Sequence, residues 1–360
     1  MNVVGEQRDH VIVLFGGESA EHDVSCVTAA HVLRALDPSR YRITTVGITR
    51  TGKWVLATEA MKSIAAGVLA LPERLVADGE PTSITPIIEQ IRTDEKTVVL
   101  PLLHGPMGED GTVQGVLELA NVAYVGSGVL GSAVAMDKGV AKQLLAARNI
   151  AQPKFVSLRD GSITETAIAN AVEQLGLPVF VKPANMGSSI GVSKARTLDE
   201  VRQAITHALS FDEWVLIEEA IVGREIEVAI LGNLEPRASV PGEIIPSHEF
   251  YDYEDKYLVD GATLVVPAHL SAEQIVEVQQ KAIEIFRILR AEGMARVDFL
   301  YEENGRGFLC NEINTIPGFT PISMYPKLWQ ASGLTYRQLL DELIALAIER
   351  HARQRRNTQR

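Results

Sequence analysis

The chain has 360 residues, more than one ordinary hydrophobic core accommodates, so we expect two or three domains. Hydrophobic residues make up 46% of it and charged residues 22%, the composition of a folded globular protein. A formal net charge of −12 argues against a nucleic-acid partner. With only two cysteines, Cys26 and Cys310, we expect reduced core thiols and neither a disulfide framework nor a zinc site.

The two ends of the chain predict no targeting segment. The first ten residues are polar and lack the apolar run of a signal peptide. No apolar stretch approaches the ~18 residues that span a bilayer. We therefore expect no membrane partner and a cytoplasmic location. Residues 351–360 are basic and are predicted to form a disordered tail.

Strand-like and helix-like segments alternate through the first third of the chain, which favours an α/β fold. The apolar segment 11–15 predicts a buried strand that ends at two glycines, and Ser19 is placed to cap the helix that follows. Residues 41–48 and 98–103 predict two further strands. Residues 1–132 are interpreted as an N-terminal domain built on an open parallel sheet.

Three glycines between residues 126 and 131 mark a change of pattern. Residues 133–222 are interpreted as a central domain and residues 223–350 as a C-terminal domain. Within them the pattern predicts helices over 137–148, 271–290 and 335–350, a strand over 179–182, and two strands, 215–219 and 225–231, that a turn at Gly223 joins.

Two carboxylates are predicted to face each other across a β-hairpin. Apolar strands flank the turn sequence Glu-Asn-Gly-Arg-Gly, and a turn centred on Gly305 places Asp298 opposite Glu312. Arg296 then lies opposite Asn314 on the same face, because residues two apart share a face. Opposed carboxylates repel each other, but they suit Mg²⁺, which prefers oxygen ligands. The hairpin therefore predicts a divalent-metal site; the alternative is a surface hairpin with solvated charges.

A loop rich in glycine and serine follows a strand that ends in Lys182. Its sequence is Asn185-Met-Gly-Ser-Ser-Ile-Gly191, in which backbone N–H groups and serine hydroxyls can bind phosphate oxygens. The order differs from the Walker loop, GxxxxGK[ST], which excludes that family. Lys138 is a further candidate cation, and segment 218–225 can offer main-chain groups to an adenine and a carboxylate to a ribose. Each feature alone also fits an ordinary charged turn.

Five segments of the chain carry more specific patterns: Leu14–Ser25, Leu103–Thr112, Lys182–Gly191, Phe250–Tyr257 and Asn311–Thr320. Together they resemble the ATP-grasp superfamily and, within it, the D-alanine–D-alanine ligase family. They occur in the family's order and span nearly the whole chain. The resemblance implies an ATP-grasp fold, in which ATP lies between the central and C-terminal domains.

For ATP, the resemblance implies two lysines at the phosphates, a main-chain segment at the adenine and a glutamate at the ribose. The implied ATP contacts are Lys138, Phe180, Lys182, Ser188, Ser189, Glu218, Glu219, Ala220, Ile221, Glu225, Lys256, Asn311 and Glu312. It also implies two Mg²⁺ or Mn²⁺ ions, which Asp298, Glu312 and Asn314 would hold.

For the amino-acid substrate, the resemblance implies that Glu21 binds the ammonium group of a first D-alanine. Glu21 would do so in a hydrogen-bonded triad with Ser188 and Tyr257, and His104 would lie beside the same substrate. A second D-alanine would meet Ser323, with Met324 at the neighbouring specificity position.

Three further groups are implied in the chemistry itself. Arg296 and the backbone N–H of Gly318 would stabilise the tetrahedral oxyanion, while Lys256 and the serine loop would close over the site. The implied reaction joins two D-alanines through a D-alanyl phosphate, releases ADP and phosphate, and supplies a peptidoglycan precursor. A homodimer is expected by the same analogy.

Close relatives of this reaction stay open as alternatives. Ligases that make D-alanyl-D-lactate carry a histidine in the region of Tyr257, so the loop in this chain favours D-alanine as the second substrate. D-alanyl-D-serine synthesis, another ATP-grasp carboxylate–amine ligase, or an inactive nucleotide-binding protein are the other readings. ADP release that depends on D-alanine would exclude the inactive protein.

Overall fold

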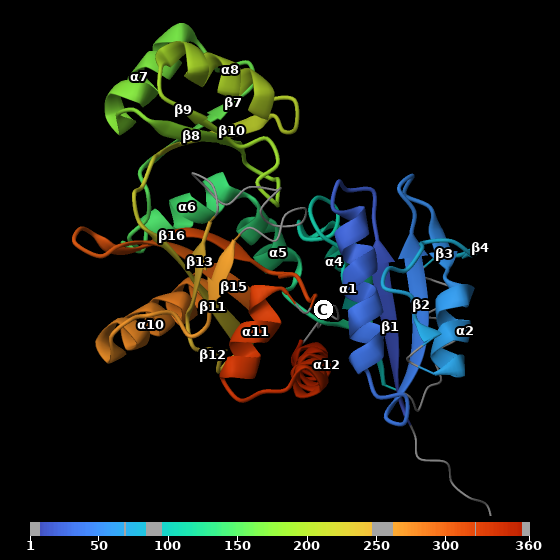
Figure 1. The fold of residues 1–360 in the computed structure, drawn as a ribbon. Coiled ribbons are helices and arrows are strands. Elements are labelled where there is room, and N and C mark those ends of the chain that lie inside the picture. The colour runs from blue at the N-terminus through green and yellow to red at the C-terminus, as the bar shows by residue number, and fades with distance from the viewer. Residues whose placement is uncertain (1–7, 68–69, 84–95, 247–261, 321, 355–360) are drawn as a thin grey trace, which may run out of the picture.

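Three β-sheets and the helices that cover them make up the part of the chain that this computed structural model describes, residues 8–67, 70–83, 96–246, 262–320 and 322–354 (Figure 1). The first sheet lies at one side of the molecule, and the second and third lie together at the other side. This mixed α/β architecture confirms the predicted fold class.

The first sheet has the strand order β4-β3-β2-β1-β5-β6. Its elements are β1 (Asp9–Gly16), α1 (His22–Ala35), β2 (Tyr41–Ile48), β3 (Trp54–Leu56), α2 (Thr58–Ala66), β4 (Glu80–Pro81), β5 (Thr97–Pro101), α4 (Thr112–Leu119) and β6 (Ala123–Tyr124). The strands β2, β1, β5 and β6 run parallel, whereas β3 and β4 add antiparallel strands at one edge. The predicted parallel sheet is therefore a mixed one. Residues 11–15 of β1 have no exposed surface, as expected for a strand covered on both faces.

The second sheet is antiparallel, with the order β7-β10-β8-β9. Its elements are β7 (Phe155–Arg159), α7 (Glu165–Leu175), β8 (Val179–Pro183), β9 (Ser193–Ala195), α8 (Leu198–Ala208) and β10 (Trp214–Glu219). Helices α7 and α8 cover one face, where Val179 and Val181 of β8 are buried. Because side chains alternate along a strand, Phe180 and Lys182 point to the opposite face, and that face borders the site described below.

The third sheet has the order β14-β13-β11-β15-β16, with β12 paired to β11. Its elements are β11 (Arg224–Gly232), β12 (Arg237–Ala238), β13 (Gly242–Ile245), β14 (Thr263–Val265), α10 (Ala272–Ile288), β15 (Gly293–Glu302) and β16 (Gly307–Asn314). Helix α10 buries Val278, Ala282 and Phe286 against one face of the sheet. Alternate residues, among them Arg296 and Asp298, project from the other face toward the second sheet.

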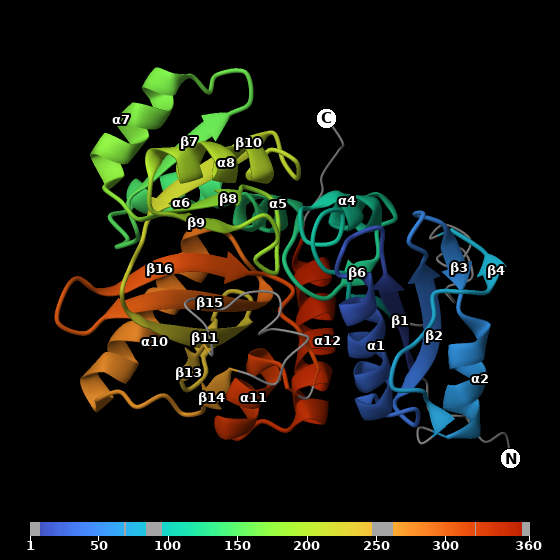
Figure 2. The ribbon, with the colours of Figure 1, turned by 45° about the horizontal axis from the view of Figure 1, so that its top comes forward.

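Helices connect the sheets into one body. They are α5 (Val129–Met136), α6 (Lys138–Ala146), α11 (Met324–Ala331) and α12 (Tyr336–Arg353). Helix α12 contacts β5 and β6 of the first sheet and β11 and β15 of the third, and Figures 1 and 2 both place it between these sheets. The buried Arg350 of this helix donates to the carbonyl of Tyr124 (2.9 Å) and lies over its ring.

Several local predictions are wrong. Ser19 does not cap α1: the N-cap position is Glu21, and the Ser19 hydroxyl donates to the His104 carbonyl (2.7 Å). The segments 215–219 and 225–231 are strands, as predicted, but they do not pair with each other, because β10 belongs to the second sheet and β11 to the third. Helix α12 extends through Arg353, so the predicted disordered tail begins in a helix.

The expectation that both cysteines are buried thiols is confirmed. Cys26 and Cys310 are buried free thiols, and burial raises the pKa of Cys26 to about 11 and that of Cys310 to about 12. Within the described ranges, no helix is both long and apolar enough to cross a bilayer.

Candidate active site

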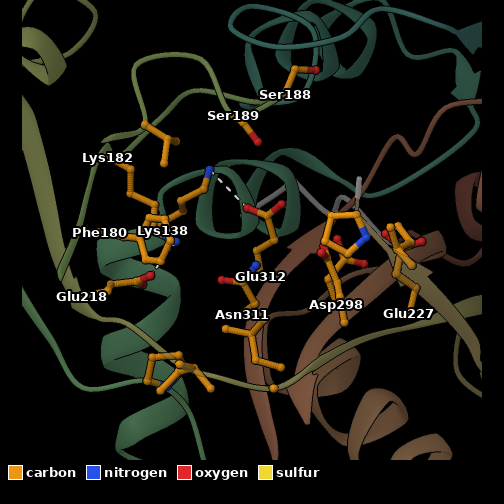
Figure 3. Close-up of a pocket in the computed structure, with 18 of the residues that line it drawn as sticks. Lys138, Phe180, Lys182, Ser188, Ser189, Glu218, Glu227, Asp298, Asn311 and Glu312 are labelled. Atoms are coloured by element: carbon orange, nitrogen blue, oxygen red, sulfur yellow. Dashed lines mark ion pairs between the residues drawn. The ribbon is translucent and has the colours of Figure 1, made fainter. Parts of the chain in front are cut away.

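A cavity of about 360 Å³ lies between the second and third sheets (Figure 3). A volume of this size suits a small-molecule site. Thirteen of the residues singled out from the sequence line it: Lys138, Phe180, Lys182, Ser188, Ser189, Glu218, Glu219, Ile221, Glu225, Arg296, Asp298, Asn311 and Glu312. The phosphate-loop candidate and the carboxylate hairpin, more than a hundred residues apart in sequence, therefore face one space.

The hairpin of β15 and β16 pairs the residues that the sequence predicts, but its turn and register differ from the prediction. Asp298 lies opposite Glu312 and Arg296 opposite Asn314. The turn is not centred on Gly305, however, since Glu302 pairs with Gly307 and four residues lie between them. A β-bulge after Asp298 compensates for this shift. The bulge leaves Asn311 without a cross-strand partner and lets Asn311 and Glu312, adjacent in sequence, both line the cavity.

Charges of both signs lie on the cavity face of the third sheet. Nε and Nη2 of Arg296 donate to the two carboxylate oxygens of Asp298, each at 2.7 Å. Arg296 Nε also lies 3.1 Å from Oε1 of Glu227, a 1% exposed side chain on β11. Burial would lower the pKa of Arg296, but the two carboxylates outweigh burial and hold the pKa well above its usual range.

Lys138 lines the same cavity. As the first residue of α6, it follows the N-cap Asp137, whose side chain accepts from the N–H of Val140. The Lys138 ammonium donates to the carbonyl of Met186 (2.7 Å) and lies 3.5 Å from Oε2 of Glu312. The lysine thus connects the serine loop to the hairpin, as the dashed line to Glu312 in Figure 3 shows.

Two buried lysines hold Glu218 on the opposite wall. Oε1 of Glu218 lies 2.8 Å from Nζ of Lys142, and Oε2 lies 2.5 Å from Nζ of Lys182. Burial raises the pKa of Glu218, but the two lysines outweigh it and the pKa is lowered. The cluster carries one net positive charge beside the cavity, which favours an anionic ligand.

The serine loop reaches the first sheet. Ser188 and Ser189 have positive φ values of 50° and 59°, a conformation that is uncommon outside glycine and gathers at functional sites. The Ser188 hydroxyl donates to the Glu21 carboxylate. A Cβ atom at Gly187 would lie 3.0 Å from Oε2 of Glu21, so a side chain there would press on the carboxylate that Ser188 binds. Two members of the predicted triad are therefore in contact.

His104 lies beside Glu21 in a buried pair with Glu109. The imidazole is 6% exposed, and its Nδ1 lies 3.6 Å from Oε1 of Glu109. Burial would lower the pKa of His104, but the Glu109 carboxylate outweighs burial and the pKa is raised. Gly105 donates its N–H to the other oxygen of Glu109 (3.2 Å). Burial also raises the pKa of Glu109, so the imidazole and this carboxyl titrate as a coupled pair beside Glu21.

The remaining predicted site residues in the described part of the chain do not line this cavity. Oδ1 of Asn314 accepts from the N–H of Ile316 (3.1 Å). The Ser323 hydroxyl contacts the N–H (3.1 Å) and hydroxyl (2.8 Å) of Thr320, and a Cβ at Gly318 would lie 2.9 Å from it. Met324 is buried in the hydrophobic core, and Ala220 donates its N–H to the carbonyl of Pro178 (3.2 Å). Lys256 and Tyr257 lie outside the described residues.

Three residues of the site were not predicted from the sequence. Glu227 has a usable signal, because it lies two residues after Glu225 and therefore on the same strand face. Lys142 lies one helical turn after Lys138, again a readable spacing. Glu109 belongs to the segment 103–112 but carries no pattern that pairs it with His104.

The oxygen donors of the third sheet fit a hard divalent ion. Asp298 and Glu312 face each other on neighbouring strands, and carboxylate oxygens are what Mg²⁺ and Mn²⁺ take. Within the described ranges, no three His, Cys, Asp or Glu side chains converge enough to hold a metal without other ligands. A site completed by phosphate oxygens agrees with both observations.

Two antiparallel sheets that close on a charged cavity, together with a first α/β sheet, define an ATP-grasp protein. Family models for the N-terminus and the C-terminus of D-ala D-ala ligase match residues 10–127 and 144–345. The chain belongs to the D-alanine–D-alanine ligase family.

Relatives and solved structures agree with that membership. A D-alanine–D-alanine ligase of Geobacillus thermodenitrificans is 46% identical, over 96% of both chains, and D-alanine–D-alanine ligase A of Chromobacterium violaceum is 45% identical, over 94% of both. The Coxiella burnetii D-alanine–D-alanine ligase structure has a TM-score of 0.80 and 37% identity, covering 96% of this chain and 95% of its own. The VanG D-Ala:D-Ser ligase of Enterococcus faecalis has a TM-score of 0.81 and 35% identity, covering 95% of this chain and 100% of its own.

Proposed function

We propose that this protein joins two D-alanines at the expense of ATP, for peptidoglycan precursor synthesis. The observation that carries the proposal is the meeting of two features at one cavity. The Asp298–Glu312 hairpin suits a nucleotide with its cation, and Ser188, on the same cavity, binds the buried Glu21, which suits an amino acid's ammonium group.

The nucleotide is proposed to lie between the second and third sheets. Lys138 and Lys182 would bind its phosphates, and the loop with Ser188 and Ser189 would cover them. The segment 218–221 would meet the adenine and Glu225 the ribose. Phosphoryl transfer requires positioning and charge stabilisation more than covalent help from the protein. The net positive cluster around Glu218 would favour that charge.

The amino acids are proposed to lie toward the first sheet. Glu21, held by Ser188, would bind the ammonium group of the first D-alanine, with His104 beside its carboxylate. That carboxylate attacks the γ-phosphoryl of ATP and displaces ADP, and the amine of the second D-alanine then attacks the acyl phosphate, expels phosphate and loses a proton. Arg296 and the Gly318 N–H would stabilise the oxyanion. Ser323 and Met324 would border the second D-alanine, while Lys256 and Tyr257 would complete the cover.

Asp298, Glu312 and Asn314 would hold Mg²⁺ or Mn²⁺, two ions in all, and such ions neutralise phosphate charge during transfer when bound. We also propose domain limits of 1–132, 133–222 and 223–350, a homodimer and a cytoplasmic location. The domain limits agree with the position of the cavity between the second and third sheets, whereas the homodimer and the location rest on the family resemblance.

Substrate-dependent ADP release tests the proposal. The purified protein is incubated with ATP and Mg²⁺ and with D-alanine alone, L-alanine, or D-alanine plus D-serine or D-lactate. ADP release with D-alanine alone, at neutral pH, and formation of D-alanyl-D-alanine are the expected results. Release that requires D-serine or D-lactate would move the assignment to the alternative ligases. No D-alanine dependence at all would refute it.

A further inference from the structure

Three carboxylates form a row across three adjacent strands of the third sheet. Glu227 on β11 lies opposite Asp298 on β15, which lies opposite Glu312 on β16. Glu227 is 1% exposed and Asp298 is 2% exposed, so water screens neither charge well. Anions at this spacing repel one another. The three carboxylates therefore need positive charges beside them to stay ionised at this spacing.

Arg296 lies between two of these carboxylates. Its Nε is 2.7 Å from Oδ1 of Asp298 and 3.1 Å from Oε1 of Glu227, while Nη2 is 2.7 Å from the other oxygen of Asp298. Figure 3 shows the side chains of Asp298 and Glu227 next to each other. At the other end of the row, Lys138 lies 3.5 Å from Glu312. One guanidinium thus serves two carboxylates at once.

A divalent cation and Arg296 compete for the same oxygens. Both oxygens of Asp298 accept from the guanidinium, so a cation that binds either oxygen shares it with Arg296 and weakens the pair. A buried guanidinium that lost its only carboxylate would be costly. Glu227 is already in contact with Nε of Arg296 and can keep that charge paired.

We propose that Glu227 is a positioning residue that shares Arg296 with Asp298, and so lets Asp298 bind a divalent cation while Arg296 stays in the site. The inference rests on the proposed function and deepens it, because it assigns a role at the same cavity to a residue outside those predicted from the sequence. Glu227 acts through Arg296 and need not touch substrate.

Manganese binding without turnover tests this role. Electron paramagnetic resonance of free Mn²⁺ gives the affinity of the protein in the presence of ADP and in the absence of D-alanine. Glu227→Gln keeps the size of the side chain but removes its charge. Of the two carboxylates that contact Arg296, only Asp298 then remains. Loss of an outer-shell partner typically weakens metal binding about 10–100-fold, and we expect a loss in this range.

Glu243→Gln is the matched control. Glu243 is another buried glutamate of the third sheet, 8% exposed, whose oxygens accept from Nε (2.8 Å) and Nη2 (2.7 Å) of Arg224. It lies on β13, one strand further from Asp298 than Glu227. Its substitution should change Mn²⁺ affinity less than about twofold, because Arg296 keeps both of its partners.

The outcomes distinguish a failure of the positioning role of Glu227 from a failure of the proposed function. Wild-type affinity in Glu227→Gln, or an equal loss in both variants, would overturn the positioning role while D-alanine-dependent ADP release by the wild type still supports the proposed function. A wild type that neither binds Mn²⁺ nor releases ADP would refute the proposed function itself. If Glu227→Gln does not fold by circular dichroism, Glu227→Asp replaces it: a shorter carboxylate should weaken Mn²⁺ binding, and unchanged affinity would overturn the role.

Discussion

Strands β1 and β15 occupy the same kind of place but carry opposite chemistry. Each is the middle one of three neighbouring strands, β1 between β2 and β5, and β15 between β11 and β16. Residues 11–15 of β1 are all apolar and fully buried. Strand β15 is as deeply buried at Ala295 and Val297, yet Arg296 and Asp298 project from its other face.

The difference shows what a central strand needs in order to carry charge. An apolar strand gains stability from burial of either face. A charged residue at the same depth needs a partner of opposite charge, because an unpaired buried charge is costly. Strand β15 finds such a partner in Glu227 on β11, while a cavity opens on that side of the sheet. One strand stabilises the fold, and the other provides the site.

Asp298→Asn should give the largest change. The amide keeps the shape of the side chain but removes the charge proposed to hold a cation, so D-alanine-dependent ADP release should fall on the order of 10²–10³-fold. Arg296 keeps Glu227, which should limit the loss of stability. Steady-state ADP release and thermal unfolding measure the two effects. A variant that keeps a tenth or more of wild-type turnover would remove Asp298 from the proposed machinery.

Ile12→Ala tests the other strand. Ile12 has no exposed surface and packs in an apolar cluster with Leu14 and Val99. Its truncation should cost about 2–5 kcal/mol of unfolding free energy, while turnover per folded molecule stays near the wild-type value. Urea unfolding and ADP release check this, and Ile12→Val should cost less, about 0.5–1.5 kcal/mol. A selective loss of turnover without loss of stability would break the contrast between the strands.

The apolar strand was the easier of the two to predict. The apolar run at residues 11–15 is enough to predict β1, because burial of both faces needs only apolar side chains. The change of sheet between β10 and β11 could not be predicted from such a pattern. Four residues separate these strands, a length typical of a hairpin, and only tertiary packing directs them into different sheets.

The candidate site was predictable where spacing alone decides it. The pairing of Asp298 with Glu312 is confirmed. The four-residue turn shifts the register by one residue from the prediction, and the bulge at Asn311 shifts it back. A bulge has no clear local sequence signal, so this agreement was partly fortuitous. The contact between Glu227 and Arg296 depends on the pairing of β11 with β15, whose partners lie about seventy residues apart in the chain.

Lys142→Met should have an intermediate effect, through the cluster of Glu218, Lys142 and Lys182. The variant leaves Glu218 with Lys182 alone and removes the net positive charge of the cluster. We expect a loss of about 2 kcal/mol of stability and an increase in the KM for ATP on the order of tenfold, with little change in the KM for D-alanine. Lys281→Met is the control, since its 3.6 Å pair with Glu277 lies at the surface and contributes little. Equal effects of both substitutions would refute a special role for the buried lysine.

His104→Gln should give the smallest change, visible as a pH dependence. The pKa of His104 is raised in the folded protein, since Glu109 outweighs burial, so its protonation stabilises the fold below the ordinary histidine pKa of about 6.5 and this contribution is lost as pH rises through the folded value. His31 is the matched opposite: burial, then Arg34, lowers its pKa, so it destabilises the fold as pH falls below 6.5. Urea unfolding from pH 5 to 9 should show that His104→Gln removes a fall in stability at higher pH, whereas His31→Gln removes a loss at lower pH. The same slope in both variants would show that Glu109 does not control the protonation of His104.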